Sequence, residues 1–468
     1  MNHCRWVHPR VFKNQASCCS RRWRSLTMAL MVIATAMPAA AQPAVPESLQ
    51  VVVNSNQDGE IQPDEGLTLR EAIALINGTL ARSQLSNAEQ AQVSNGSSRI
   101  MFDLPIDRTT IELESMLPPI TRAVEIDGSS QPSYNAKAGQ QVPQPVVALT
   151  SAPEVEVLRG LTLSADNIKV NGLSLYGFNS SHRRTATTPP ADIFVVHQFL
   201  PQDRHQKVKV NAEAFRLKNR TERNRQPHNT AENLPEQPPK GILITDNWLG
   251  ITPDNQMPSR PSAFGVSVFN SDGVTIRNNR ISHHDGSAII SGARAESLEI
   301  SNNKIIGNGL AGMPDAIRLD GEINNGVIRN NLICGNDGSA IYLFKSTGSI
   351  EIHDNAIKFN GQRLRRAAIF LMGSDHQVHH NSIHHQTGPG VAVAAYPKSD
   401  RNLITNNRFG HLDGLSIDLI SRNRVGVKDY QRGDGPNVFQ RDTGNRRLDT
   451  GKRAVNTPEI LSREFMLF

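Results

Sequence analysis

One short line of sequence occurs six times between Phe264 and Leu419, and it constrains the fold of this chain more than any other feature. Each copy is eight residues long, as in VTIRNNRI at Val274–Ile281 and LEISNNKI at Leu298–Ile305. The sixth residue of every copy is asparagine, at Asn279, Asn303, Asn331, Asn355, Asn381 and Asn407. These asparagines are 24, 28, 24, 26 and 26 residues apart. Self-similarity with a period of this length predicts a solenoid of stacked coils.

A second, apolar line alternates with the first and indicates that the coils are made of β-strands. It reads SAIIS from Ser287, DAIRL from Asp315 and SAIYL from Ser339. Short β-branched runs with period-2 alternation, bounded by Asn, Gly and Asp, are typical of strands. No segment of the region carries a helical apolar stripe, and the leucine-rich-repeat pattern is absent. The predicted fold is all-β, a single-stranded parallel β-helix whose coils pair with their neighbours.

The recurring asparagine has a physical reason in such a fold. Asparagines at the same turn of successive coils lie above one another, so their amides can bond along the column and to the backbone of the turn. We therefore expect an asparagine ladder through the six repeats. The residue before each ladder position varies among Asn, Asp and His, which favours an outward-facing side chain. Taken together, these patterns resemble the right-handed parallel β-helix superfamily, which includes pectate lyases, polygalacturonases, mannuronan epimerases and phage tailspikes.

The first 41 residues are predicted to be a signal peptide. Six basic residues and no acidic one precede an apolar core at Met28–Met37, and Ala39–Ala41 supplies small residues for cleavage. This core is too short for a permanent membrane span, so no transmembrane segment is expected after its removal. We therefore expect an exported protein, located in the periplasm, at the outer surface or outside the cell.

Removing residues 1–41 changes what the composition implies. The whole chain has 50 Lys and Arg against 44 Asp and Glu. Without the six basic residues of the signal, the two groups are equal at 44, so the high isoelectric point is no evidence for a nucleic-acid partner. Only Cys334 remains of the 4 cysteines, so no intrachain disulfide can form. An exported chain without disulfides needs a large core, which a long solenoid supplies.

The mature chain divides into three predicted regions. Residues 42–98 hold a strand at Leu49–Val53 and an amphipathic helix at Thr68–Leu80 that begins with a T-x-x-E capping box and covers the open end of the solenoid. Residues 99–419 form the β-helix, interrupted by a long charged insertion at 180–240 within which Asp192–Val196 returns as a strand. Residues 420–468 form a C-terminal cap or tail.

Several lines of this chain resemble the signatures of a family of exported bacterial β-helix proteins. LTLREAI at Leu67–Ile73 resembles that family's opening SLREAI line. The segments Val124–Pro132 and Asn247–Gly250 are similar to its IDG-S-QP and N-aromatic-IG lines, and Ser416–Leu419 to its C-terminal IDL line. The resemblance implies export and a β-helix, but the family mostly lacks an assigned activity.

Acidic residues recur near one predicted corner of the coils. Asp285 and Asp337 each precede a glycine and lie four residues before the core isoleucine of the second line, whereas Asp315 lies two residues before it. We expect Asp285, Asp315 and Asp337 to come from successive coils, with Arg318 and Asp320 nearby. Carboxylates one coil apart would be separated by about 4.8 Å and two coils apart by about 9.6 Å, near the spacings of retaining and inverting glycosidases. The alternative is that Asp-Gly only makes the turn, with Ser287 and Ser339 on the solvent side.

Two further patterns suggest metal ligands. Asn54, Asn56, Asp58, Glu60 and Glu65 fall at positions 1, 3, 5, 7 and 12 of a calcium loop, although a strand precedes it and a plain turn explains the same letters. Calcium is the one cofactor that the sequence suggests. Five histidines lie within ten residues, at His376, His379, His380, His384 and His385. No closed set of metal ligands can be named among them.

The sequence favours a non-catalytic exported surface or matrix protein that binds polysaccharides or cell-surface components along its coil faces. The alternative is a polysaccharide lyase, hydrolase or epimerase that uses the acidic corner. No complete polygalacturonase, epimerase or pectate-lyase catalytic line is present, and a fold alone does not imply a function.

Overall fold

The computed structural model describes residues 48–135, 142–180, 189–197, 238–344, 346–394, 399 and 401–420. The predicted signal peptide and all but the first residue of the predicted C-terminal region lie outside the described residues. So do residues 181–188 and 198–237 of the predicted insertion.

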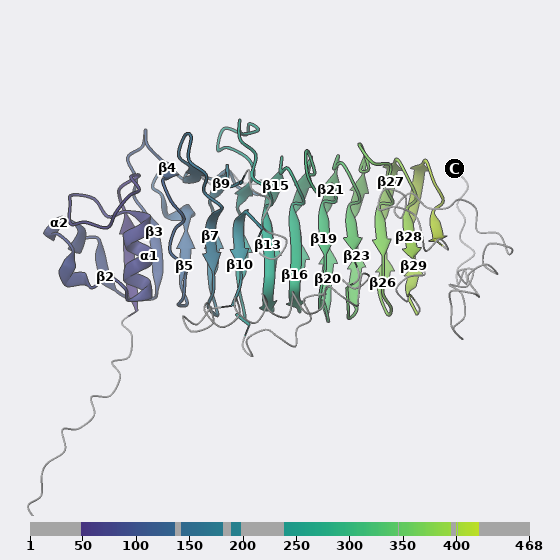
Figure 1. Cartoon of the computed structure of the whole chain (residues 1–468), viewed down its shortest axis with the longest axis horizontal. Coiled ribbons are helices and arrows are strands. Elements are labelled where there is room, and N and C mark those ends of the chain that lie inside the picture. The colour runs from purple at the N-terminus through teal and green to yellow at the C-terminus, as the bar shows by residue number, and fades with distance from the viewer. Residues whose placement is uncertain are drawn as a thin grey trace, which may run out of the picture. The chain divides into compact units, whose positions relative to one another are not determined.

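Three sheets wrap around one core, and all their strand pairings except that of β1 with β2 are parallel, which confirms the predicted parallel β-helix (Figure 1). Sheet A contains β2 (Val93–Asn95), β1 (Leu49–Val53), β3 (Arg99–Phe102), β5 (Glu125–Asp127), β8 (Lys169–Asn171), β11 (Leu243–Thr245), β14 (Thr275–Arg277), β17 (Glu299–Ser301), β20 (Gly326–Arg329), β23 (Ile350–His353), β26 (Gln377–His379) and β29 (Leu403–Thr405). Sheet B contains β4 (Thr110–Leu113), β6 (Ala148–Ser151), β9 (Ser174–Tyr176), β12 (Trp248–Leu249), β15 (Arg280–Ser282), β18 (Lys304–Ile306), β21 (Leu332–Cys334), β24 (Ala356–Lys358), β27 (Ser382–Gln386) and β30 (Arg408–Leu412). Sheet C contains β7 (Arg159–Leu163), β10 (Ala191–Val195), β13 (Val266–Asp272), β16 (Ile289–Glu296), β19 (Ile317–Leu319), β22 (Ile341–Leu343), β25 (Ile369–Leu371), β28 (Val391–Ala394) and β31 (Ile417–Ile420).

Each copy of the eight-residue line makes two strands and the corner between them. In the first copy, β14 belongs to sheet A and β15 to sheet B, and Asn278 and Asn279 turn the chain between them. Asn278 has φ 55°, in the left-handed region. The same conformation recurs at the equivalent residue of the later coils, namely Asn302, Asn330, Asp354, His380 and Asn406. Asn, Asp and His enter this region more readily than other non-glycine residues, which explains why this outward position varies only among them.

The six ladder asparagines form one continuous column at this corner. Asn279 donates from its backbone N and its Nδ2 to Oδ1 of Asn303, at 2.9 and 3.1 Å. Asn303 bonds Asn331 in the same way, and Asn331 donates through Nδ2 to Oδ1 of Asn355 at 3.0 Å. The column continues through Asn381 to Asn407. One further member, Asn247 in the coil before the repeats, precedes Asn279.

Replacing Asn331 with alanine is expected to lower the free energy of unfolding by about 1–3 kcal/mol, because it leaves buried polar groups without partners. Asn331 is 1% exposed, and its Nδ2 also donates to the Ile300 carbonyl at 2.9 Å. Chemical denaturation measures the effect. The exposed neighbour Asn330 is the control, replaced by glycine because its φ is 56°. Equal losses for the two variants would contradict the ladder.

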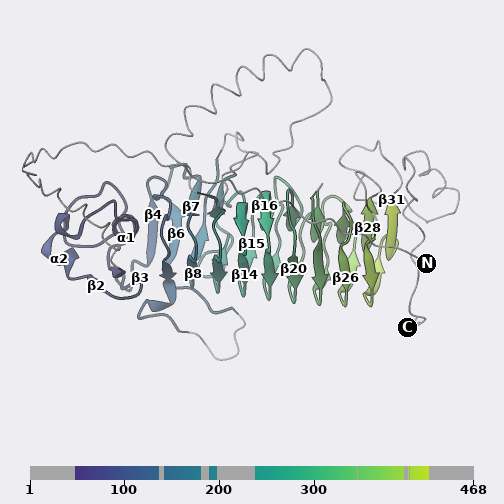
Figure 2. The ribbon, with the colours of Figure 1, turned by 90° about the horizontal axis from the view of Figure 1, so that it is seen from below.

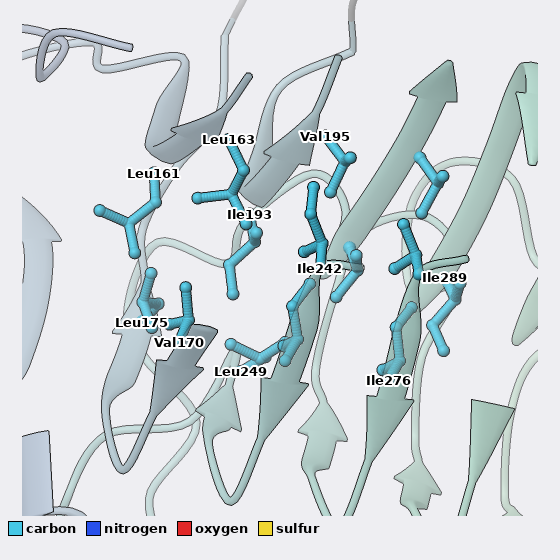
Figure 3. Close-up of a cluster of buried hydrophobic side chains, with 14 of the residues drawn as sticks. Leu161, Leu163, Val170, Leu175, Ile193, Val195, Ile242, Leu249, Ile276 and Ile289 are labelled. Carbon is cyan, nitrogen blue, oxygen red and sulfur yellow. The ribbon is translucent and has the colours of Figure 1, made fainter. Parts of the chain in front are cut away.

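The core is a column of inward-facing Ile, Leu and Val side chains from all three sheets (Figure 3). Ile276, Ile300, Ile328 and Ile352 stack in sheet A, and each is 0% exposed. Equivalent residues therefore contact one another between coils, so the core runs unbroken along the solenoid.

The N-terminal end is closed by the helix α1 (Leu69–Asn77) (Figure 1). Thr68 and Glu71 form the expected capping box, and Gly78 ends the helix in the left-handed region with φ 74°. Leu69, Ile73 and Ile76 are buried in the main core cluster. Three short elements follow α1: η1 (Arg82–Gln84), α2 (Asn87–Gln90) and β2. Since β1 pairs in parallel with β3, sheet A begins before α1 rather than at the predicted boundary of residue 99.

The predicted insertion at 180–240 contains a strand of the solenoid. The strand β10 pairs in parallel with β7 on one side and with β13 on the other, and all five of its residues are buried. Sheet C is therefore continuous across this region, as the return of Asp192–Val196 suggested. One short element, η2 (Gly128–Ser130), follows β5 at the start of the solenoid.

Candidate functional site

The structure separates the three carboxylates that the sequence placed at one corner. Asp315 is 0% exposed and accepts hydrogen bonds from Nη1 of Arg366 at 3.0 and 3.1 Å and from the Ser339 backbone N at 2.9 Å. It stands where the neighbouring coils have Ser287 and Ser339, which are also buried. The interpretation of these serines as solvent-side residues is therefore wrong, and Asp315 does not take the turn position of Asp285 and Asp337. The cause is register, because Asp315 lies two residues later in its coil than the aspartate of Asp-Gly.

Asp285 and Asp337 occupy equivalent turns two coils apart, but each has its own partner. Asp285 accepts a hydrogen bond from Nδ2 of Asn179 at 2.8 Å. Asp337 accepts one from Nε of Arg363 at 2.9 Å, and burial raises the pKa of its carboxyl against the opposing effect of this arginine. The intervening coil is bonded to both turns, since Gly312 donates to the Asp285 carbonyl at 2.6 Å and the Asp337 backbone N donates to the Asn308 carbonyl at 3.0 Å. These contacts favour a turn-forming role over an acid/base pair.

Arg318 and Asp320 lie on the outer face of sheet C. The guanidinium of Arg318 is 4.9 Å from the ring centre of Tyr342 and 4.5 Å from that of Phe344. It also pairs with Asp320 at 3.5 Å and with Asp315 at 3.8 Å. A cation held over two rings and between two carboxylates stabilises the packing of this face.

The residues of the predicted calcium loop form hydrogen bonds with other protein groups. Both carboxylate oxygens of Asp58 accept hydrogen bonds from Arg70, at 2.8 and 2.7 Å, and Asp58 also accepts from the Glu114 backbone N at 2.9 Å. Oδ1 of Asn54 accepts from the Leu67 backbone N at 2.7 Å. Asn56 donates to the Thr110 carbonyl. Glu60 and Glu65 are exposed. A guanidinium on the central carboxylate opposes a divalent cation, so these residues do not fit a calcium site.

The clustered histidines take different positions. His379 stacks on His353 with ring centres 5.1 Å apart, and its Nε2 lies 2.8 Å from Oε1 of Glu351. His385 stacks between Phe359 and His411 along the neighbouring corner. His376, by contrast, is 0% exposed. Within the part of the chain that the structure describes, no three His, Cys, Asp or Glu side chains form a metal-binding group.

Acid is expected to destabilise the protein through His376. Burial lowers the pKa of His376, and its Nε2 lies 3.2 Å from the Met372 carbonyl. Because the folded state disfavours the imidazolium, stability is present above the unfolded-state pKa of about 6.5 and is lost as the pH falls below it. Denaturation measured between pH 7 and pH 5 should show a smaller loss for His376→Asn than for the wild type. The exposed His385→Asn is the control, and an unchanged slope in His376→Asn would contradict the assignment.

Sequence reasoning missed a second ladder and the buried pair at its end. Asn308 bonds Asn336, and Asn336 bonds Asn360, through Nδ2 to Oδ1 contacts of 3.0 and 2.8 Å. In the preceding coil the column ends in His284, whose Nδ1 lies 2.9 Å from Oδ1 of Asn308. The signal was available, because these residues follow the first-ladder asparagines by five positions in successive coils.

His284 links this ladder to a buried carboxylate. Its Nε2 lies 2.8 Å from Oδ2 of Asp192 on β10, and both side chains are 0% exposed. Ser262 donates its hydroxyl to the other oxygen of Asp192. Burial raises the pKa of Asp192 against the opposing effects of His284 and Ser262. All three groups lie inside the solenoid, where their hydrogen bonds connect β10 to the coil of His284. Because they are buried, a substrate cannot reach them.

An open polar pocket of about 420 Å³ lies at the N-terminal coils. Its floor is the outward face of β4, including Thr110 and Glu112, and its wall is the loop that carries Asn56 and Asp58. The pocket is lined by Asn56, Gln57, Asp58, Asp107, Arg108, Thr109, Thr110, Glu112, Glu114 and Ala152. The lining thus combines carboxylates, amides and hydroxyls.

Comparison with known proteins agrees with the fold. Residues 240–376 match the model of the right handed beta helix region, which settles the hand of the solenoid over that part of the chain. No curated protein matches the sequence. None of the described helices is long and apolar enough to cross a membrane.

Solved structures share the architecture at low identity. The enzymatically active domain of bacteriophage CBA120 tailspike protein 2 aligns with a TM-score of 0.42 and 11% identity, over 69% of this chain and 42% of that chain. PfbA, a surface adhesin of Streptococcus pneumoniae, aligns with a TM-score of 0.41 and 12% identity, over 68% and 80%. The A-module of the Azotobacter vinelandii mannuronan C-5 epimerase aligns with a TM-score of 0.37 and 12% identity, over 69% and 89%. Likenesses this distant carry no argument about function.

Proposed function

We propose that the protein is exported and binds glycans at the N-terminal pocket without cleaving them. The pocket is the observation that carries this proposal, because its carboxylate, amide and hydroxyl groups match the hydrogen-bonding needs of sugar hydroxyls. The signal-peptide pattern and the resemblance to exported β-helix proteins support the location.

The charge of the pocket narrows the ligand class. Of the four carboxylates that line it, Asp58 is paired with Arg70 and Asp107 with Arg108, at 2.7 and 3.8 Å, which leaves the charges of Glu112 and Glu114. A net negative pocket repels uronic-acid polymers and favours neutral sugars or amino sugars.

Binding to neutral and amino-sugar oligosaccharides is expected to depend on Glu112. Replacing Glu112 with glutamine removes one negative charge from the outward face of β4 and should weaken binding about tenfold, measured by calorimetry on a ligand from a glycan array. The control is Glu65→Gln, an exposed glutamate on the adjacent loop that does not line the pocket. Equal affinity in the Glu112→Gln variant would exclude the pocket as the site.

The same preparation should release no reducing ends and no unsaturated sugars. The partners of Asp285, Asp315 and Asp337 argue against an acid/base pair among them. Cleavage that disappears in Asp337→Asn with the fold intact would replace this proposal with the lyase, hydrolase or epimerase alternative.

A further inference from the structure

The outer face of sheet C differs from the outer faces of the other two sheets. Its central outward row runs through Arg318, Tyr342, Phe370, Ala392 and Asp418, which pair coil to coil. On sheets A and B the same coils present exposed residues, including Gln377, Lys358 and Arg408. The three central residues of this row, Tyr342, Phe370 and Ala392, are aromatic or apolar, and such a patch on one face of a solenoid marks a surface that something covers.

The C-terminal half of this face forms a cluster of its own. It contains Tyr342, Phe344, Ala367, Phe370, Met372, Ala392, Ala394 and Ile420. The rings of Tyr342 and Phe370 meet edge to face with centres 5.0 Å apart. This cluster is separate from the main core, which lies on the other side of the sheet.

These side chains point outward and are nevertheless buried. Phe370 and Ala392 are 0% exposed, Tyr342 is 2% and Met372 is 4%. Among the described helices and strands, the strands of sheet C make substantial contacts with their ladder neighbours, and none packs across this face. These exposed fractions are those of a single chain, so the cover comes from another part of the same chain.

We propose that the chain's own C-terminal segment, residues 421–468, docks on this cluster. The segment starts at the cluster, because β31 ends at Ile420, which is the last described residue and a member of the cluster. Figure 2 shows β28 and β31 at the C-terminal end of the solenoid. The coils of β22, β25, β28 and β31 span about 15 Å, a distance that about five extended residues cover.

The composition of the segment fits an apolar surface. Its end carries Ile460, Leu461, Phe465, Met466, Leu467 and Phe468. Burying such side chains against Tyr342 and Phe370 removes apolar area from water on both sides. Docking along the side of the solenoid differs from the cap across its open end that the sequence suggests. The partly buried core residues Ile404 and Phe409 of the last coil mark that open end.

Thiol labelling of the folded, mature full-length protein tests the proposal. In a Cys334→Ser background, Ala392→Cys places one reporter on the cluster and Gln377→Cys places the control on the exposed face of sheet A. We expect Ala392→Cys to react about 100-fold more slowly than Gln377→Cys. Equal rates would overturn the proposal.

Two changes to the segment identify the occupant. Phe465→Asp combined with Leu467→Asp should raise the labelling rate of Ala392→Cys about tenfold and leave Gln377→Cys unchanged. Cutting an engineered protease site just after Ile420 in the folded protein should have the same effect. A protected Ala392→Cys that responds to neither change would overturn the assignment to residues 421–468. Protection that depends on protein concentration would instead assign the face to a second copy. A response at Ile404→Cys alone, in the core of the last coil, would assign the segment to the open end.

Discussion

Replacing His284 with asparagine is expected to lower the free energy of unfolding by about 3–5 kcal/mol, because it leaves the Asp192 carboxylate buried without its partner. Asparagine suits the column sterically, since Asn308 and Asn336 occupy the same position in the next coils. The loss therefore reports the missing contact of His284 with Asp192 rather than the shape of the site. Chemical denaturation at neutral pH measures it.

A double replacement separates the loss of the Asp192 interaction from any change in the shape of the site. In the Asp192→Asn background the carboxylate is gone, so adding His284→Asn should cost much less than it does in the wild type. The adjacent His283 is the matched control. It has φ 61°, a conformation that asparagine tolerates, and His283→Asn should change stability by less than about 0.5 kcal/mol. Additive losses at Asp192 and His284 would show that the pair does not interact.

Replacing Arg366 with methionine is expected to cost about 3–5 kcal/mol for a related reason. Arg366 is 4% exposed and Asp315 is 0% exposed, and methionine preserves the length of the side chain but removes the charge. Asp315 would then keep only the Ser339 backbone N and the more distant Arg318 among the partners described above. The adjacent arginine is the control, because Arg365 pairs with Asp413 at 3.2 Å on the surface, where its side chain is 63% exposed.

Arg365→Met should therefore stay within about 0.5 kcal/mol of the wild type. Adding Asp315→Asn to Arg366→Met should restore part of the loss. A large loss in Arg365→Met together with a small one in Arg366→Met would show that the two arginines have exchanged partners relative to this structure.

The solenoid and its first ladder can be predicted from the sequence because the residues that form them recur in every coil. Asn279 and Asn303 are equivalent in the repeat, and parallel stacking brings equivalent residues into contact whatever the rest of the chain does. The capping box at Thr68 and Glu71 is similarly local, since it involves residues three apart. The second ladder was equally periodic, but its first member is a histidine, which hid the pattern at Asn308 and Asn336.

The candidate site depended on contacts that no local pattern contains. Asp58 matches a calcium loop in spacing, but its partner Arg70 comes from the helix that follows, so the geometry of the turn decides between cation and arginine. Asp192 and His284 are separated in sequence by the region at 198–237 and meet only because β10 returns to sheet C.

The sequence by itself determined the coil, the ladder and the end cap, because each arises from residues that repeat or lie within one turn of one another. Only the tertiary structure decided which of the carboxylates are engaged by partners and which could act as acid or base. Asp285, Asp315 and Asp337 look alike in the sequence, yet Asn179, Arg366 and Arg363 reach them from other coils. The desolvation of a carboxylate and the identity of its partner depend on the coils stacked above and below it, and a two-residue difference in register is enough to move Asp315 from a surface turn to a buried ion pair.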